Sequence, residues 1–360
     1  MMRITWPGWF ALQSASLRHP CRPLGRARAN RYTADQHLAR QFSSYPSSNP
    51  CDKFPDMFTS RRQLLSRIAA AGVAFRSITA NPLGKPIGLQ LYTLDAEMRK
   101  DFPGTLSKVA QIGIKEVEIA DTYRKTAAEW KAALNQSGLH CRSVHVYDTN
   151  QPPEQIMSFA SELGAKYVVT SLNAPPEIVK MAGGAPDWFH LVKAMERMTL
   201  DDWKKSAAIA NQLAEQAAKH GLAYAYHNHN VEFRKFGDAT AFEMLLSSTN
   251  PALVTFEMDC GWVSAAGYNP ATFLEKYPER ICMLHIKAFQ AAPPNLNLVG
   301  PKEPKPAELG RGKPDYKAIF AAAAQAQVEQ YYIEQEPPFK KMSALEAVTV
   351  DYGYLHEMPS

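Results

Sequence analysis

The sequence predicts a closed (β/α)8 barrel, a TIM barrel with a parallel sheet, between residues 86 and 360, and three observations carry that prediction. After Pro86, short apolar runs rich in β-forming residues alternate with segments of helical spacing. Eight such runs occur, and they are apolar almost throughout, which is typical of parallel strands buried on both faces. The stretch is about 275 residues long, close to the ~250 of one barrel domain. An open doubly wound sheet is the alternative, but no Gly-x-Gly-x-x-Gly turn follows the first run.

The order of the expected elements follows from that alternation. Strands are expected over residues 87–92, 116–120, 141–147, 166–171, 223–229, 253–259, 281–287 and 329–336. Helices are expected over residues 102–111, 127–136, 155–163, 200–220, 239–246, 270–276 and 316–325. Gly113, Gly138, Gly164 and Gly221 follow the first four helices, and glycine is the usual residue after a helix end. A longer insertion around residues 183–186 precedes the helix over 200–220.

The composition indicates one large domain that follows a basic N-terminal leader. Of 360 residues, 46% are hydrophobic and 21% are charged, which allows a substantial core. The formal net charge is +5, but arginine is concentrated in the first 85 residues, where acids are scarce. We therefore infer no nucleic-acid partner from the charge. The five cysteines form no Cys-x-x-Cys pair, so no disulfide framework is predicted.

The first 85 residues predict two segments outside the barrel. Residues 1–56 show no period that builds a core element, so we interpret them as a disordered extension or as sequence upstream of the true start. Residues 57–85 resemble a twin-arginine export signal, with Arg61 and Arg62, a leucine pair and a short apolar run. That run is shorter than the ~20 residues of a membrane-spanning helix, so no stable membrane anchor is expected. The expected location is periplasmic or secreted; a basic amphipathic helix, a mitochondrial-type transit peptide and a cytoplasmic location are the alternatives.

Polar residues stand where the expected strands end, on the face that carries the active site of such barrels. A single histidine or acid at a strand end is commonly an ordinary polar contact, but the last four strands each offer one on an alternating face. In chain order the candidates are Gln90, Tyr92, Glu118, His145, His227, His229, Asp259, His285, Lys287, Glu334 and Glu336.

The pattern on strands five to eight predicts one divalent metal ion. A metal that polarises hydroxyl and carbonyl oxygens needs several nitrogen or oxygen ligands around one point, with positions left for substrate. Alternation along a strand places His227 and His229 on one face, and Glu334 and Glu336 likewise share a face. Such ligands suit Mn, Zn, Co or Mg to differing degrees, so the identity of the metal stays open.

Two stretches beside these strand ends are expected to shape the substrate pocket. Gly261, two residues after Asp259, predicts a sharp backbone turn, and Trp262 predicts an apolar wall against a sugar face, with core packing as its alternative. Residues 293–312 contain prolines, glycines and the cations Lys302, Lys305 and Arg311; they form either a grip for a phosphate or carboxylate or a solvated loop.

Six stretches together carry a family resemblance. They are Ile87-Gly88-Leu89-Gln90-Leu91-Tyr92, Tyr226-His227-Asn228-His229, Met258-Asp259-Cys260-Gly261-Trp262, Leu284-His285-Ile286-Lys287, Gly310-Arg311-Gly312 with Asp315-Tyr316, and Ile333-Glu334-Gln335-Glu336. They span nearly all of residues 86–345, and their order and spacing together are specific, whereas any one alone is weak. The layout resembles the xylose isomerase-like barrel superfamily of sugar (phosphate) isomerases and epimerases.

The resemblance implies a metal held by a Glu, an Asp, a His and a final Glu from strands five to eight. By position it implies Asp259, His285 and Glu334 as ligands. The chain departs at strand five, where family members often read Glu-Asn-His and this chain reads His227-Asn228-His229. His227 then takes the first ligand position, and His229 or Glu232 are the alternatives.

The resemblance also implies proton transfer next to a carbonyl on a sugar or keto-sugar substrate, through an enediolate. The expected base is Glu334 or Glu336, and the candidates for acid, proton shuttle or oxyanion partner are His145, His229 and Lys287. A salt bridge at the barrel rim is the alternative for Lys287. The residues expected to contact substrate are Gln90, Tyr92, Glu118 and Trp262, although Tyr92 equally suits the core.

These residues do not separate the reactions that share such an intermediate. It can be reprotonated at another carbon, reprotonated on the other face, or can expel a β-substituent. The main expectation is a metal-dependent isomerase or epimerase, and a dehydratase or lyase on a keto-sugar or keto-glycoside is the alternative. An endonuclease IV-like phosphodiesterase is less favoured, because it needs extra ligands for three metals and a basic DNA track. A non-catalytic sugar-binding barrel and a homo-oligomeric assembly both stay open.

Overall fold

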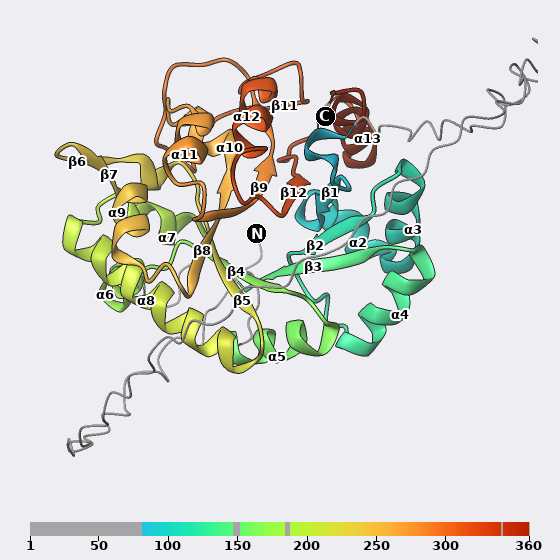
Figure 1. Ribbon diagram of the computed structural model, residues 1–360, viewed down its shortest axis with the longest axis horizontal. Helices are drawn as coiled ribbons and strands as arrows, with labels where there is room; N and C mark the ends of the chain where they lie inside the picture. Colours follow the sequence, from blue (N-terminus) through green and yellow to red (C-terminus); the bar gives the residue numbers. More distant parts are fainter. Residues whose placement is uncertain (1–80, 147–151, 184–187, 340, 360) are drawn as a thin grey trace, which may run out of the picture. The chain divides into compact units, whose positions relative to one another are not determined.

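The structure is a computed structural model that describes residues 81–146, 152–183, 188–339 and 341–359. Eight parallel strands close into a barrel in the order β1-β12-β9-β8-β5-β4-β3-β2. Their bounds are β1 Gly88–Gln90, β2 Glu116–Ile119, β3 His140–His145, β4 Tyr167–Ser171, β5 Ala223–His227, β8 Val254–Asp259, β9 Ile281–Ile286 and β12 Gln330–Ile333. Figure 1 shows the strands at the centre and helices around them. The (β/α)8 fold expected from the sequence is confirmed.

Helices follow the strands and cover the outside of the barrel. The α-helices are α2 Asp95–Lys100, α3 Phe102–Ile112, α4 Ala127–Ser137, α5 Pro153–Leu163, α6 Pro176–Met181, α7 Trp188–Met195, α8 Leu200–Lys219, α9 Ala241–Ser248, α10 Cys260–Ala265, α11 Pro270–Lys276, α12 Tyr316–Ala323 and α13 Ala344–His356. Two small sheets pair β6 Lys235–Phe236 with β7 Ala239–Thr240, and β10 Ala288–Phe289 with β11 Pro306–Ala307. Within the described ranges, no helix is both long and apolar enough to cross a bilayer.

Local sequence sets where helices begin and end. At the start of α4, the Thr126 side chain accepts from the backbone N–H of Glu129, and the Glu129 side chain accepts from that of Thr126. The helix ends at Gly138, whose φ of 66° is left-handed and favours glycine. Asp259 begins α10 by accepting a hydrogen bond from the backbone N–H of Trp262 at 2.8 Å. One carboxylate at a strand end therefore also sets the start of a helix.

Predicted and observed boundaries differ mainly at the strand ends. β12 stops at Ile333, so Glu334 and Glu336 lie beyond the strand, although the backbone N–H of Glu334 still donates to the Ile286 carbonyl at 3.1 Å. β5 stops at His227 rather than at residue 229. Tyr147, the predicted end of the third strand, lies outside the described residues, as do residues 184–186 of the insertion and residues 1–80 of the leader.

Five helices, α2, α6, α7, α10 and α13, were not among the expected elements. α2, α6 and α10 have six residues each, too few to show a helical period in the sequence. α13 has 13 residues, but one of its buried positions is Asp351, which interrupts the apolar stripe. Two of them contribute to the candidate site, because Leu191 of α7 and Trp262 of α10 line its cavity.

Candidate metal centre

The C-terminal strand ends surround a cavity of about 410 Å³. Most of its polar lining comes from the strand ends, and most of its apolar lining comes from loops beyond them. The polar lining includes Gln90, His145, His227, His229, His285, Glu334 and Glu336. The apolar lining includes Leu191, Trp262, Phe289, Leu298, Val299, Pro304, Pro306 and Pro337.

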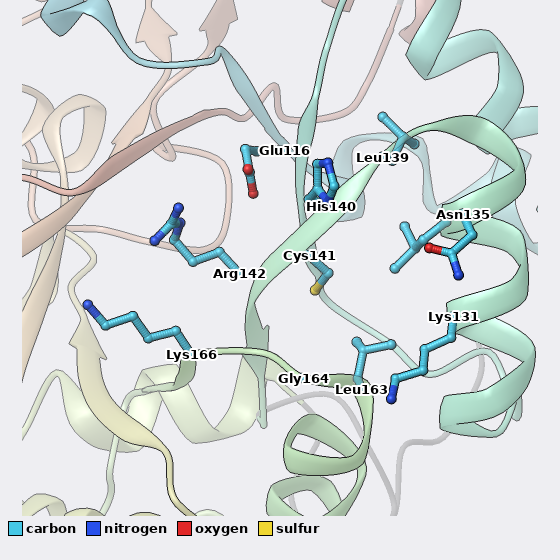
Figure 2. A pocket seen from close by; sticks show the side chains of 11 residues that line it. Glu116, Lys131, Asn135, Leu139, His140, Cys141, Arg142, Leu163, Gly164 and Lys166 are labelled. Carbon is cyan, nitrogen blue, oxygen red and sulfur yellow. The ribbon is translucent and has the colours of Figure 1, made fainter.

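A second cavity, of about 480 Å³, opens at the other end of the barrel, and Figure 2 shows it. Its residues stand where strands begin: Glu116 starts β2, His140 starts β3 and Lys166 precedes β4. The active sites of TIM barrels lie at the C-terminal ends of the strands. The candidate site is therefore the cavity around the histidines.

Lys287 is buried among three carboxylates, one at the end of β8 and two that follow β12. Its Nζ lies 3.0 Å from Asp259 Oδ2, 2.8 Å from Glu334 Oε2 and 2.7 Å from Glu336 Oε1. Burial alone would lower the pKa of the lysine, but the three acids outweigh it and hold that pKa well above its usual value. With 1% exposure, Lys287 forms a buried ion-pair cluster and not the rim salt bridge considered from the sequence. Glu334 and Glu336 line the cavity in front of it.

His227 and His285 each direct one ring nitrogen toward the carboxylates that surround Lys287. His285 Nδ1 lies 2.6 Å from Glu334 Oε2 and 3.9 Å from Asp259 Oδ2. His227 Nε2 also lies 3.9 Å from Asp259 Oδ2. Neighbouring strands fix this arrangement, because Asp259 of β8 pairs in register with His285 of β9.

The other nitrogens of the same two rings point to carboxylates deeper in the barrel. His227 Nδ1 lies 3.0 Å and His285 Nε2 3.2 Å from Glu257 Oε2. Glu118 Oε2 lies 2.6 Å from His285 Nε2. His145 Nε2 lies 3.0 Å from both Glu118 Oε2 and Glu257 Oε2. Three imidazoles and two buried carboxylates therefore form one layer beneath Asp259.

The deeper carboxylates stay ionised although neither is exposed. Burial alone would raise the pKa of Glu118, but His145 and His285 outweigh it and hold that pKa well below the usual value. Burial and Glu118 likewise raise the pKa of Glu257, yet the three histidines bring it to about 2. Burial would lower the pKa of His285, and the surrounding glutamates raise it well above the usual value instead. Burial and the neighbouring His285 hold the pKa of His227 well below its usual value.

His227, His229 and Glu232, the three candidates for the metal ligand from strand five, have different surroundings in the structure. His229 lines the cavity, with its ring centroid 5.9 Å from that of Trp262, and burial followed by the Lys287 charge lowers its pKa to about 3. Glu232 is turned elsewhere: it accepts hydrogen bonds from the Tyr226 hydroxyl at 2.9 Å and from the backbone N–H of His229 at 3.0 Å. Of the three, His227 is the one whose ring reaches Asp259.

Three of the four residues expected to contact substrate line the cavity, and the fourth, Glu118, does not. Tyr92, Trp262 and Gln90 line the cavity, and Trp262 packs on Phe289 with ring centroids 4.5 Å apart. Glu118 is fully buried and is not part of the cavity lining; it instead accepts a hydrogen bond from Gln90 Nε2 at 2.7 Å. Its placement therefore favours a role beneath the histidines over contact with substrate.

The expectation of a sharp turn at Gly261 is wrong. Gly261 lies inside α10, and its φ is not in the left-handed region. The glycine is required because a Cβ there would lie 2.3 Å from Lys287 Cγ and 2.8 Å from Lys287 O. The absence of a side chain thus makes room for the lysine, which the sequence does not reveal.

Comparison with known proteins places this geometry in a family. A family model described as a xylose isomerase-like TIM barrel matches residues 106–348. The chain belongs to that family. An inosose dehydratase of Clostridium beijerinckii is 26% identical over 262 residues, which cover 68% of this chain and 85% of the relative.

Solved structures of the xylose isomerase-like fold superpose on the barrel. A sugar phosphate isomerase/epimerase from Parabacteroides distasonis gives a TM-score of 0.60 at 23% identity, over 76% of this chain and 98% of that chain. The IolI protein with a bound zinc atom gives 0.56 at 14% identity, again over 76% of this chain and 98% of that chain. At these identities the likeness shows the fold.

The described side chains fit a divalent metal at the position that the xylose isomerase-like family implies. Four buried residues each offer a ligand atom within 4.8 Å of the others; this upper group is His227, Asp259, His285 and Glu334. Asp259 Oδ2 is buried and, among the described residues, lacks a hydrogen-bond donor of good geometry, although Lys287 Nζ stands 3.0 Å away. A mixed imidazole and carboxylate set suits Zn, Mn or Co.

Glu257 is the residue of this site that sequence reasoning missed. It lies two positions before Asp259 on β8 and therefore points to the same side of the strand. A second group of four buried residues includes it; this lower group is His145, His227, Glu257 and His285. The signal in the sequence is the spacing of Glu257 and Asp259, which is the same i, i+2 spacing as that of Glu334 and Glu336.

Proposed function

We propose that the protein is a metal-dependent dehydratase, a lyase that removes water from a keto-cyclitol or keto-sugar. The sequence favoured an isomerase with a lyase as the alternative, and the relative named inosose dehydratase supports the alternative better. One observation carries the proposal. Glu336 lines the cavity beside the upper group without belonging to it, and so offers a carboxylate for proton transfer.

The upper group would hold the metal, and the metal would supply an electrophile that polarises the substrate carbonyl and a neighbouring hydroxyl. The protein's own part is to hold substrate against Glu336. His145, His229 and Tyr92 line the cavity and can position substrate hydroxyls. Trp262 and Phe289 offer an apolar face to the C–H side of the ring.

Elimination of water requires a base for the proton α to the carbonyl and an acid for the departing β-hydroxyl. Glu336 can serve as both in turn. Its carboxylate takes the α-proton while the C–H electron pair moves into an enolate. The same carboxyl then protonates the β-hydroxyl as the C–O bond breaks and the C=C bond forms. The substrate loses one water, and Glu336 returns to a carboxylate held by Lys287 at 2.7 Å.

The test uses the full chain, stripped of metal and then reloaded with Zn, Mn, Co or Mg. Candidate substrates are inososes, keto-sugars and keto-glycosides, and products are followed by mass and by enone absorbance. We expect a product lighter by one water, formed only with metal and lost with Glu336→Gln. Solvent deuterium entering the α-carbon of a product that has lost no water would assign an isomerase or epimerase instead.

Metal content is the second measurement. We expect Asp259→Ala and His285→Ala to abolish metal binding, since each removes one ligand of the upper group. Full occupancy in both variants would show that the metal lies elsewhere. Sugar affinity without turnover in any metal form would assign a binding protein.

A further inference from the structure

Two groups of four buried side chains can each surround a metal ion, and they share His227 and His285. Each shared ring directs one nitrogen to the upper group and the other to the lower group. A neutral imidazole has one lone-pair nitrogen and one N–H, so it can ligate on one side only. The two groups are therefore alternatives, and distances decide between them.

The lower group has the spacing of hydrogen bonds. Glu257 Oε2 lies 3.0 Å from His145 Nε2, 3.0 Å from His227 Nδ1 and 3.2 Å from His285 Nε2. Metal–ligand bonds of ~2.0–2.2 Å in a tetrahedral site separate the ligand atoms by roughly 3.3–3.6 Å. Contacts of 3.0 Å fit one proton between each nitrogen and the carboxylate.

Glu118, on β2, supports the same conclusion. Its Oε2 lies 2.6 Å from His285 Nε2, the spacing of a hydrogen bond, and it also accepts from Gln90 Nε2 at 2.7 Å. Both Glu118 and Glu257 have 0% exposure, so no solvent competes for the imidazole N–H groups.

The upper group is more open. Asp259 Oδ2 is 3.9 Å from both His227 Nε2 and His285 Nδ1, wider than a hydrogen bond. Three of its members, all except Asp259, line the cavity, and three members of the lower group do so too, so the spacing of the ligand atoms and not access separates the two groups. Its one short contact joins His285 Nδ1 and Glu334 Oε2 at 2.6 Å, where a proton would leave when metal binds.

We propose that Glu257 and Glu118 are positioning residues that select the ligand nitrogens of the proposed metal site. They accept the N–H groups of His227 Nδ1 and His285 Nε2, which leaves His227 Nε2 and His285 Nδ1 as lone pairs for one metal in the upper group. Carboxylates commonly hold metal-binding histidines in this way, and their loss typically weakens metal affinity by ~10–100-fold. The inference rests on the metal site of the proposed function and adds the residues that orient it.

Ring-nitrogen NMR on the zinc-loaded, full-length wild type tests the assignment without any substitution. We expect His285 to carry its proton on Nε2 and His227 on Nδ1, with zinc on the opposite nitrogens. Zinc on His285 Nε2 and His227 Nδ1 would place the metal in the lower group and overturn the proposal. Two zinc ions per chain would do the same.

A Glu257→Gln variant tests the energetic part. We expect one zinc per chain, bound ~10–100-fold more weakly than in wild type, and an altered visible spectrum of the cobalt form. The matched control is Glu329→Gln, whose carboxylate pairs with Lys166 at the other end of the barrel and should leave zinc affinity unchanged. Unchanged affinity in both Glu257→Gln and Glu118→Gln would overturn the positioning role.

The outcomes separate this inference from the proposed function. A wild type that binds no zinc, cobalt or manganese would remove the metal site, and the dehydratase proposal with it. A wild type that binds one metal but shows wild-type affinity in both glutamine variants would remove only the inference. If Glu257→Gln does not fold, the Glu118→Gln affinity and the wild-type NMR measurement still decide.

Discussion

Gly261 carries only a hydrogen atom where other residues carry a Cβ, and the packing against Lys287 leaves no room for a larger group. Replacing it with alanine would place a Cβ 2.3 Å from Lys287 Cγ and 2.8 Å from the Lys287 carbonyl oxygen. We expect Gly261→Ala to lower the free energy of unfolding by about 1–3 kcal/mol, the usual cost of overpacking, and to reduce activity by displacing the lysine. Urea unfolding and steady-state kinetics check both.

A matched glycine distinguishes crowding from backbone effects. Gly353 lies inside α13, and an added Cβ would meet nothing within 4 Å. Gly353→Ala should raise the free energy of unfolding by up to about 1 kcal/mol, since alanine is the better helix former. A Gly261→Ala protein as stable as Gly353→Ala would contradict the steric explanation.

Lys287 is predicted to support chemistry rather than metal binding. In Lys287→Met the carboxylates of Asp259, Glu334 and Glu336 lose the ammonium that contacts all three. We expect kcat to fall by ~10²-fold or more, in the range that loss of acid–base function gives, while one metal per chain is still bound. Lys276→Met, on the surface, is the control. Loss of metal binding with Lys287→Met would reassign the lysine to the metal site itself.

At the scale of single elements, α13 carries a buried acid whose protonation should affect stability. Asp351 is 1% exposed and accepts a hydrogen bond from the backbone N–H of Leu309 at 2.8 Å. Burial raises its pKa to about 7, above the ~3.9 of an unfolded aspartate. Between these values unfolding releases a proton, so this group's contribution to stability is complete below about pH 4 and decreases up to about pH 7.

The Asp351→Asn variant removes that titration and keeps an acceptor oxygen. We expect wild type to lose more stability than the variant as the pH rises from about 4 to about 7, and the two to run parallel above pH 7. Chemical denaturation at several pH values gives the difference. Parallel curves across the whole range would show that Asp351 does not titrate in this window.

The sequence predicted the strands of the barrel better than it predicted how far along the barrel axis each side chain lies. Strand alternation correctly indicated which side of a strand a residue occupies, and so brought His227, Asp259 and His285 to one centre. It does not state how far along the barrel axis a side chain lies. Glu118 was therefore assigned to substrate although it lies beneath the histidines, and Glu257 was overlooked as strand interior. α10 was missed because its six residues are too few to show a helical period, and its N-cap, Asp259, was interpreted only as a ligand.

At the scale of the whole molecule, export stays a prediction of the sequence alone. Arg61 and Arg62 precede the leucine pair and the short apolar run of the leader. We expect the full chain to reach the periplasm of a bacterium with a twin-arginine pathway, and the Arg61→Lys and Arg62→Lys double variant to stay in the cytoplasm. Cell fractionation with immunodetection measures the distribution. Equal distributions of the two proteins would contradict this interpretation of the leader.

The seam between β1 and β12 has a consequence for biosynthesis. These two strands close the barrel through the pairs Gly88 with Tyr332 and Leu89 with Ile333, and Glu334 follows directly. A nascent chain that ends before residue 330 leaves β1 with one neighbour and lacks the fourth member of the upper group. Translation of the final strand thus completes the sheet and the upper group together, so we expect metal to bind only to chains that extend through Glu334.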